Sequence, residues 1–282
     1  MSARLLSGKE AAAKVFDEVK SAMRAFTQPP SLAVVQVGSD PASGVYVNMK
    51  EKRCLECGIR SAVFRLPENT TETELSELIS KLNSDQTIDA FLIQLPLPEH
   101  INEARMLELI RPDKDADCFH PYNFGRLAAG NPLVLPCTPA GVLVLLDHYG
   151  IEIEGKRALV IGRSNIAGKP LGLMLLARHA SVTWAHSRTR NLPDLCREAE
   201  LIFAAVGKPN FLTADMVSPG AVVVDVGINR VPSGDGYVLR GDVDFEAVSE
   251  RASWITPVPG GVGAMTIAML LSNCVALARA RL

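Results

Sequence analysis

The sequence predicts an α/β protein with two domains, each built around a parallel β-sheet. The chain has 282 residues, about twice the usual length of one domain. Short apolar runs alternate with helix-like stretches along it. These runs are continuous in Val, Ile, Leu and Ala, which is typical of strands covered by helices on both faces. One series of such units precedes residue 140 and a second follows it, so we expect two domains.

The apolar runs are expected to form strands at Leu32–Val37, Ala62–Arg65, Ile88–Leu95, Arg157–Ile161, Ser181–His186, Leu201–Val206 and Ala221–Val226. The stretches between them that we expect to be helical include Ser43–Cys57, Glu72–Leu82 and Lys169–His179.

A helix is expected at the border between the domains. Thr138 is a typical N-cap residue, and Gly150 suits the position just after a helix end. The last stretch, Met265 to Leu282, is also helical in pattern and largely apolar. We therefore predict one domain over residues 1–140 and a second over residues 141–264. The helix over residues 265–282 is expected to pack back on the first domain.

Composition and charge exclude several classes of protein. Lys and Arg number 29 and Asp and Glu 31, a formal charge of −2, and no basic block argues for nucleic-acid binding. No run of 18 apolar residues predicts a transmembrane helix, since the best candidate is interrupted by Thr266, Ser272 and Asn273. The N-terminus lacks the apolar core and cleavage site of a secretory signal, so we expect a cytoplasmic protein.

The six cysteines are not expected to form disulfides in a cytoplasmic chain. Cys54 and Cys57 have CxxC spacing, but they stand just before Gly58, which marks a helix end. A redox pair needs the start of a helix, where the dipole favours a thiolate. No second pair is spaced to complete a zinc site. We therefore interpret these cysteines as structural thiols and expect no metal.

A glycine-bearing turn follows the strand Arg157–Ile161 and precedes a helix, which is the geometry of a dinucleotide phosphate site. Gly162 and Gly168 would let the backbone approach the pyrophosphate, and the first N–H groups of the helix would face its charge. Ser164 stands where the usual G-x-G-x-x-G pattern has its second glycine. Spacing alone therefore leaves an ordinary turn as an alternative.

The end of the next strand indicates which dinucleotide would bind. It continues into His186-Ser187-Arg188-Thr189, which contains no acid. NAD sites have a carboxylate here, and a carboxylate would repel a 2′-phosphate, whereas Ser187 and Arg188 would bind one. Arg163, in the turn itself, would add a second positive charge. A dinucleotide site should therefore prefer NADP, with a solvated loop arginine as the alternative for Arg188.

A candidate reactive group lies in the first domain. Tyr46 and Lys50 are four residues apart on a predicted helix and so share one face. A lysine partly removed from water can exchange protons near neutral pH; a surface lysine with a packed stem is the alternative. Gln94 lies at the carboxyl end of a predicted strand, where α/β proteins place their ligand sites. Its amide could orient a neighbouring lysine, or it could simply face water.

Two further segments carry candidate binding groups. Asp113-Lys114-Asp115-Ala116-Asp117 lacks the remaining ligands of a Ca²⁺ loop, but a carboxylate can also accept two parallel N–H donors from a heterocycle such as a 2-aminopyrimidinone. We expect Asp113 and Asp115 to be solvated residues of an acidic turn. The loop Thr256–Gly263, rich in Pro and then in Gly, suits close approach to a ligand or a plain connection.

Several blocks of sequence occur in a familiar order along nearly the whole chain: VGSDPASGVYVNMKEK from Val37, QLPLP from Gln94, PDKDADCFHPYNFGRL from Pro112, PCTPAG from Pro136, GRSNIAGKP from Gly162, VVVDVGINR from Val222, GDVDF from Gly241 and ITPVPGGVGAMT from Ile255. Together they resemble the bifunctional methylenetetrahydrofolate dehydrogenase/methenyltetrahydrofolate cyclohydrolase family, the FolD-type enzymes. So many ordered blocks are more specific than any single motif above.

The resemblance implies a folate domain and an NADP domain with the active site between them, and usually a homodimer formed through the NADP domain. It implies NADP-dependent oxidation of 5,10-methylenetetrahydrofolate to 5,10-methenyltetrahydrofolate, followed by hydrolysis to 10-formyltetrahydrofolate. Lys50 would be the main catalytic residue of the hydrolysis, and Gln94 would form a hydrogen bond with it. Tyr46 would stack on the aminobenzoyl part of the folate, and Asp117 would anchor the pterin.

The remaining implied site residues hold the cofactor and close the pterin site. The loop at Pro259, Gly260 and Gly261 would close over the pterin. The residues implied to hold NADP are Gly162, Arg163, Ser164, Gly168, Ser187, Arg188 and Ile228. The 2′-phosphate would lie near Arg163 and Ser187.

Three residues depart from the pattern of the family. Cys118 replaces the glycine that usually follows the pterin-anchoring aspartate, Ala264 replaces a proline of the final loop, and Ala167 replaces a valine of the phosphate turn. Cys118 would stand beside the pterin and alter its affinity, and Ala264 would loosen its loop. Three other functions stay open: a monofunctional dehydrogenase without ring opening, a catalytically silent NADP- or folate-binding protein, and a shikimate-type dehydrogenase.

Overall fold

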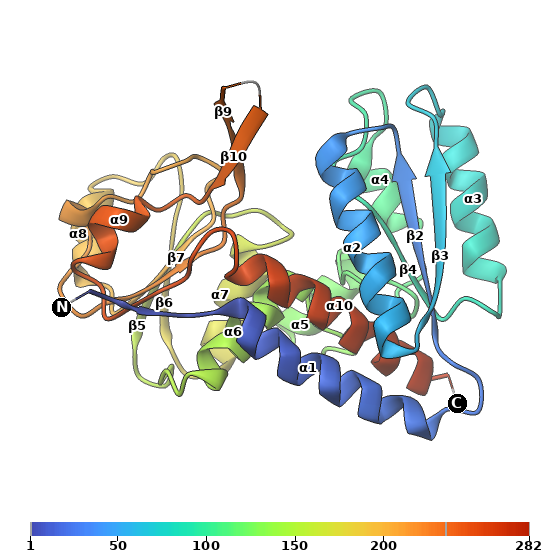
Figure 1. Cartoon of the computed structure of the whole chain (residues 1–282), viewed down its shortest axis with the longest axis horizontal. Coiled ribbons are helices and arrows are strands. Elements are labelled where there is room, and N and C mark those ends of the chain that lie inside the picture. The colour runs from blue at the N-terminus through green and yellow to red at the C-terminus, as the bar shows by residue number, and fades with distance from the viewer. Residues whose placement is uncertain (1, 235, 282) are drawn as a thin grey trace. The chain divides into compact units, whose positions relative to one another are not determined.

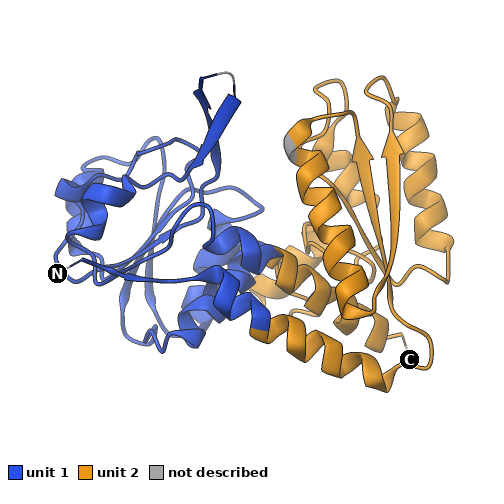
Figure 2. Cartoon of the chain, in the orientation of Figure 1, with its two compact units in different colours: residues 1–13, 138–266 blue, residues 14–137, 267–282 orange. Residues whose placement is uncertain are grey.

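The computed structural model describes residues 2–234 and 236–281. By its internal contacts the chain divides into two units, shown in different colours in Figure 2. Unit 1 comprises residues 1–13 and 138–266, and unit 2 comprises residues 14–137 and 267–282. The borders fall inside three helices, which are α1 (Gly8–Ala22), α6 (Cys137–His148) and α10 (Val262–Arg279). Each of these helices therefore begins in one unit and ends in the other.

Unit 1 contains a six-stranded parallel sheet with the order β1-β11-β8-β7-β5-β6 (Figure 1). Its strands are β1 (Arg4–Leu5), β5 (Arg157–Ile161), β6 (Ser181–Ala185), β7 (Leu201–Ala204), β8 (Val222–Asp225) and β11 (Trp254–Ile255). The helices that accompany it are α7 (Gly168–Ala177), α8 (Leu192–Glu198) and α9 (Phe245–Ser249). The four longer strands were predicted from their apolar runs, and their parallel pairing confirms the α/β class.

The sequence did not predict β1 and β11 or the antiparallel hairpin of β9 (Asn229–Ser233) and β10 (Gly236–Arg240). β1 and β11 are two residues long, too short for an apolar pattern, and both hairpin strands are largely exposed. β1 pairs with β11, which explains why residues 1–13 group with unit 1 rather than with the residues that follow them.

Unit 2 contains a three-stranded parallel sheet with the order β3-β2-β4 (Figure 1). Its strands are β2 (Ser31–Val37), β3 (Arg60–Leu66) and β4 (Ala90–Ile93). Its further helices are α2 (Pro41–Cys57), α3 (Glu72–Ser84), α4 (Glu103–Glu108) and α5 (Pro121–Ala128). All seven residues of the central strand β2 are buried, which is why the strand reads as a continuous apolar run.

The two long helices of unit 2 pack on its sheet and have well-defined ends. Alternate residues of β2 share a core cluster with the apolar face of α3, and α2 contacts β2 and β3. Thr71 and Glu74 form a capping box at the start of α3, worth about 1 kcal/mol of helix stability. Asp40 is the N-cap of α2, and its side chain accepts a hydrogen bond from the Ser43 N–H; Gly58 caps the other end, as predicted.

The CxxC cysteines lie in the last turn of α2. Cys54 and Cys57 are buried and free. Burial raises the pKa of the Cys54 thiol to about 12, so its reactive thiolate is strongly disfavoured. These properties fit structural thiols.

Two details of the long helices differ from the sequence prediction. Thr138 lies inside α6, which begins at Cys137, and its hydroxyl pairs with the Thr266 hydroxyl at 3.0 Å instead of capping the helix. α10 begins at Val262, three residues before the predicted start, while the predicted end at Leu282 lies outside the described residues. By length and composition α10 is apolar enough to cross a membrane, yet 67% of it is buried within the fold.

Candidate functional site

Lys50 and Gln94 form a buried pair in unit 2. Lys50 lies on α2 and is only 6% exposed, and its Nζ donates a hydrogen bond to Gln94 Oε1 at 3.0 Å. Gln94 directly follows β4, and its backbone N–H donates to the Val35 carbonyl of β2. Its side-chain Nε2 donates to the Leu95 carbonyl, which directs Oε1 toward the lysine. The sheet edge therefore holds the lysine amine in one place.

Tyr46 lies one helical turn before Lys50 on α2, on the same face, as the spacing predicted. Its side chain is half-buried, and burial raises the pKa of its phenol. The ring therefore stays neutral at physiological pH and offers an aromatic surface beside the lysine.

Asp117 follows a short segment, residues 114–116, that pairs with the strand β4. The Phe91 N–H of β4 donates to the Lys114 carbonyl at 2.8 Å, and the Ala116 N–H donates to the Phe91 carbonyl at 3.1 Å. Residues 114–116 thus run parallel to β4, and this register brings Asp117 level with Ile93, the last residue of β4. Asp117 is 7% exposed.

Asp117 and Lys50 both act electrostatically on one buried thiol of unit 2. Burial and the nearby Asp117 carboxylate raise the pKa of the Cys137 thiol, while the Lys50 ammonium opposes them. Both charges therefore act on one thiol in unit 2. The structure brings Lys50 and Gln94 into direct contact, although they lie 44 residues apart in the sequence.

The prediction that Asp115 is a solvated residue is wrong. Asp115 is 1% exposed, and its carboxylate accepts hydrogen bonds from the His120 N–H and the Asn123 side chain, both at 2.9 Å. The neighbouring Lys114 is equally buried and donates to two carbonyls at the end of α3. These partners come from other elements, so the acidic run alone could not reveal them. Asp113 is partly exposed and pairs with Arg111, as a solvated turn predicts.

In unit 1, Gly162 and Gly168 allow a close approach that other residues would prevent. A Cβ atom on Gly162 would lie 2.2 Å from the Ala205 carbonyl oxygen, and one on Gly168 would lie 2.3 Å from the Gly162 carbonyl oxygen. The turn after β5 is therefore packed tightly between the end of β7 and the start of α7. A backbone cradle of this kind fits a dinucleotide pyrophosphate.

Ser164 accepts hydrogen bonds from two backbone N–H groups of the turn. Its Oγ accepts hydrogen bonds from the Ala167 and Gly168 N–H groups at 3.2 and 3.3 Å. The sequence predicted that the first N–H groups of α7 would face the phosphate. In the structure the N–H groups of Ala167, the N-cap, and of Gly168, the first residue of the helix, donate to the serine instead.

Arg163 and Ser187 follow two neighbouring strands at the same sheet edge. Ile161 of β5 pairs in register with Ala185 of β6, and the Gly162 N–H donates to the Ala185 carbonyl at 2.8 Å. Arg163 and Ser187 are each two residues beyond this pair, and both are exposed. Arg188 is exposed as well, so hydroxyl and guanidinium groups gather where the prediction placed a 2′-phosphate.

The remaining predicted residues of unit 1 lie after β8 and β11. Ile228 follows β8 and is 42% exposed. Gly260 accepts a hydrogen bond from the Gly8 N–H at 2.9 Å, which ties the Pro259–Gly261 loop to the start of α1. The Ala264 N–H donates to the Gly261 carbonyl at 3.3 Å, a bond that proline could not make.

Two buried carboxylates that the sequence prediction missed organise the loops at this sheet edge. Asp242 is fully buried, and its oxygens accept hydrogen bonds from the N–H groups of residues 206–208 and from the Asn229 side chain. Asp225, at the end of β8, accepts from three further backbone N–H groups, and burial raises its pKa to about 7. Their places in the DVGIN and GDVDF blocks were the only sequence signal.

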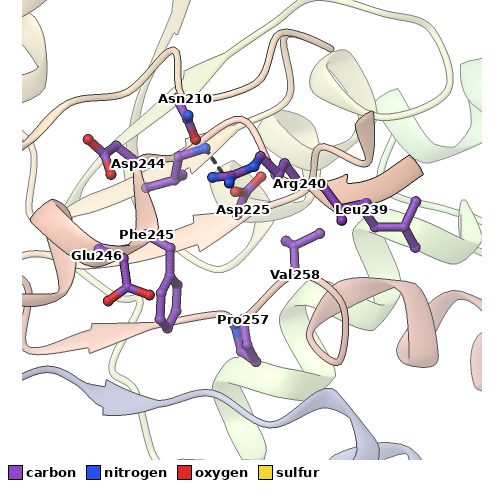
Figure 3. Close-up of a pocket in the computed structure, with 12 residues that line it drawn as sticks. Asn210, Asp225, Leu239, Arg240, Asp244, Phe245, Glu246, Pro257 and Val258 are labelled. Carbon is purple, nitrogen blue, oxygen red and sulfur yellow. Dashed lines mark hydrogen bonds between the residues drawn. The ribbon is translucent and has the colours of Figure 1, made fainter. Parts of the chain in front are cut away.

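A cavity of about 290 Å³ lies in unit 1 beside these carboxylates (Figure 3). Residues of β10, the segment 241–246 and the loop at Pro257 and Val258 line it. Figure 3 shows Asp225 and Arg240 together in its wall. Pro257 and Val258 belong to the candidate loop Thr256–Gly263, but none of the site residues implied by the family resemblance lines this cavity. Among the described residues, no group of three His, Cys, Asp or Glu side chains could hold a metal ion.

Comparison with known proteins gives a consistent result over the whole chain. A family model described as Tetrahydrofolate dehydrogenase/cyclohydrolase, catalytic domain, matches residues 6–117, and its NAD(P)-binding counterpart matches residues 136–282. Bifunctional protein FolD from Moorella thermoacetica is 54% identical over 282 residues, which covers 99% of this chain and 100% of that protein.

Solved structures agree with the sequence relatives. The bifunctional FolD enzyme from Campylobacter jejuni is 49% identical with a TM-score of 0.95, and the match covers all of both chains. The FolD enzyme from Trypanosoma brucei, solved with NADP cofactor and an inhibitor, is 36% identical with a TM-score of 0.95 and covers 100% of this chain and 99% of its own.

Proposed function

This chain belongs to the tetrahydrofolate dehydrogenase/cyclohydrolase family, and we propose that Lys50 and its neighbours in unit 2 act on the folate while the turn at Gly162 in unit 1 holds NADP. The enzyme is bifunctional. It uses NADP to oxidise 5,10-methylenetetrahydrofolate to 5,10-methenyltetrahydrofolate, and it hydrolyses that product to 10-formyltetrahydrofolate. Identity of about half over the full chain favours this folate chemistry over a shikimate-type dehydrogenase.

The buried hydrogen bond between Lys50 and Gln94 is the observation that best supports the hydrolytic site. Ring opening requires removal of a proton from the attacking water and delivery of one to the leaving nitrogen. Lys50 assists these transfers, because its amine is shielded from bulk water and has one fixed partner. Gln94 orients the amine with one hydrogen bond. The other hydrogen-bonding positions of the Lys50 nitrogen serve water and folate.

Asp117 and Tyr46 bind the substrate in this proposal. A buried carboxylate accepts two parallel N–H donors of the pterin better than an exposed one does, because little water competes with them. The neutral, half-buried Tyr46 ring stacks on the aminobenzoyl group. The loop at Pro259, Gly260 and Gly261 closes the pterin site.

Unit 1 supplies the cofactor site. When bound, NADP⁺ accepts a hydride from the one-carbon bridge of the folate. The tight turn at Gly162 and Gly168 fits its pyrophosphate, and Arg163 with Ser187 binds the 2′-phosphate. The residues that complete the cofactor site are Ser164, Arg188 and Ile228.

We further propose a homodimer formed through unit 1, located in the cytoplasm. Tyr237 and Val238 of β10 are 49% and 40% exposed, and covering them would remove apolar surface from water. Light scattering should give twice the 30.3 kDa of one chain, and a mass of 30.3 kDa at micromolar concentration would contradict the dimer. All six cysteines are free and buried, which suits a reducing compartment.

A spectrophotometric assay that follows both steps tests the proposed function. With 5,10-methylenetetrahydrofolate, NADP⁺ should support at least about tenfold faster oxidation than NAD⁺ at equal concentration, because only NADP⁺ offers a phosphate to the Arg163 region. Decay of added methenyltetrahydrofolate, measured separately, should proceed at an enzyme-dependent rate. Oxidation without methenyl decay would identify a monofunctional dehydrogenase, and tight binding of both ligands without turnover would identify a silent binding protein.

A further inference from the structure

Asn273 is a buried polar residue in the second half of α10, a largely apolar helix. It is 5% exposed, and its Nδ2 donates hydrogen bonds to the Ala116 carbonyl at 2.9 Å and the Leu135 carbonyl at 2.7 Å. The same nitrogen lies 3.4 Å from the Cys137 sulfur. Both protons of the amide are thus used on two segments that lie more than a hundred residues earlier in the chain. A carboxamide in an apolar helix is costly unless it is bonded in this way.

The carbonyl that Asn273 holds belongs to the peptide unit that joins Ala116 to Asp117. Cys137 donates to the same oxygen through its thiol at 3.4 Å. On the other side of Ala116, its N–H donates to the Phe91 carbonyl of β4. Two successive peptide units are therefore fixed from opposite sides, by the sheet and by α10. The orientation of the second one sets the direction in which the Asp117 side chain leaves the backbone.

Cys118, the residue after Asp117, adds a further hydrogen bond that holds this turn. Cys118 has a left-handed backbone with φ of +62°, an unfavourable conformation for a non-glycine residue. Its thiol donates to the Val134 carbonyl at 3.3 Å, next to Leu135, which Asn273 holds. The turn around Asp117 and the segment 134–137 are thus tied together, with Asn273 bonded to both.

We propose that Asn273 is a positioning residue of the folate site, whose carboxamide fixes the peptide that carries Asp117 and thereby sets where that carboxylate meets the pterin. This inference rests on the proposed role of Asp117 as the pterin anchor. Asn273 does not touch the substrate in this account; it acts through the Ala116 carbonyl. Loss of the amide would let the peptide rotate, and a misplaced anchor costs affinity for the folate more than it costs any step that follows binding.

Substitution Asn273→Leu tests the proposal, because leucine has the same number and branching of side-chain heavy atoms as asparagine and suits an apolar helix. The KM for 5,10-methylenetetrahydrofolate should rise by about tenfold, since two hydrogen bonds that hold the anchor are lost. The KM for NADP⁺ should change less than about twofold. Asn83→Leu is the matched control: Asn83 also bonds two backbone groups of unit 2, at Leu109 and Arg111, but not the peptide units that flank Asp117. It should leave the folate KM unchanged.

Two further variants cover the case of misfolding and test the role of Asp117 separately. If Asn273→Leu does not fold, Asn273→Ala removes the same two hydrogen bonds with a smaller side chain and should likewise raise the folate KM by about tenfold. Asp117→Ala, measured alongside, separates the two proposals. An unchanged folate KM in Asp117→Ala would overturn the anchor role itself. A raised KM in Asp117→Ala together with an unchanged KM in folded Asn273→Leu or Asn273→Ala would overturn the positioning role alone.

Discussion

The substitution Lys50→Met is expected to abolish hydrolysis of 5,10-methenyltetrahydrofolate while NADP affinity stays nearly unchanged. Methionine keeps an unbranched side chain of similar length but cannot accept or donate a proton. A positioned acid–base group contributes about 10²- to 10⁴-fold to a rate, so methenyl decay should slow by at least about 100-fold. Lys50 lies in unit 2 and the predicted NADP residues lie in unit 1, which is why cofactor binding should survive. Methenyl decay and NADP titration measure the two effects separately.

Lys52→Met is the matched control for this experiment. Lys52 lies two residues further along α2, and its side chain is 75% exposed, with Nζ 3.9 Å from the Glu56 carboxylate. The same loss of an amine there should leave hydrolysis within about twofold of wild type, because an exposed pair contributes little. Full hydrolysis by Lys50→Met, or equal losses in the two variants, would remove Lys50 from the acid–base role.

The strands β2 and β5 are buried along nearly their whole length, which made them visible in the sequence, although the more exposed β3 and β6 were predicted as well. β2 and β5 read as continuous apolar runs because helices cover both of their faces, and their bounds were predicted within a residue. The hairpin β9–β10 has no such signal, because its strands are exposed and pair only with each other. β1 and β11 were missed for a related reason, since two residues define no period.

The candidate site also has parts that the sequence could predict and parts that it could not. The pairing of Lys50 with Gln94 could be anticipated, because helix spacing places one residue and the end of a strand places the other. The burial of Asp115 could not, because its partners His120 and Asn123 belong to α5 and its cap. The role proposed for Asn273 is less visible still, since its hydrogen-bond partner Ala116 is 157 residues away. Local patterns predict where a side chain lies; they do not predict which distant backbone holds it there.

Substitution Arg163→Ala should weaken NADP binding by about tenfold to a hundredfold and leave NAD binding almost unaffected. Hydrogen bonds to charged groups contribute about 1.5–3 kcal/mol, and NAD lacks the 2′-phosphate that would receive them. The exposed guanidinium and the Ser187 hydroxyl follow strands that pair in register, so one phosphate can reach both. Equilibrium titration with NADP and with NAD, at the same ionic strength, measures the ratio of the two affinities.

The control must separate contact with the phosphate from the general positive potential of unit 1. Arg178→Ala removes the same charge from the other end of α7, where Arg178 pairs with Asp147 at 2.7 Å. If the NADP preference arose from net charge, both variants would lose it equally, and the loss would shrink as salt screens the field. If Arg163 contacts the phosphate, only Arg163→Ala should lose the preference. If the preference for NADP survives in Arg163→Ala, Ser187 and Arg188 are the groups that distinguish NADP from NAD. In that case Arg188→Ala should lose the preference.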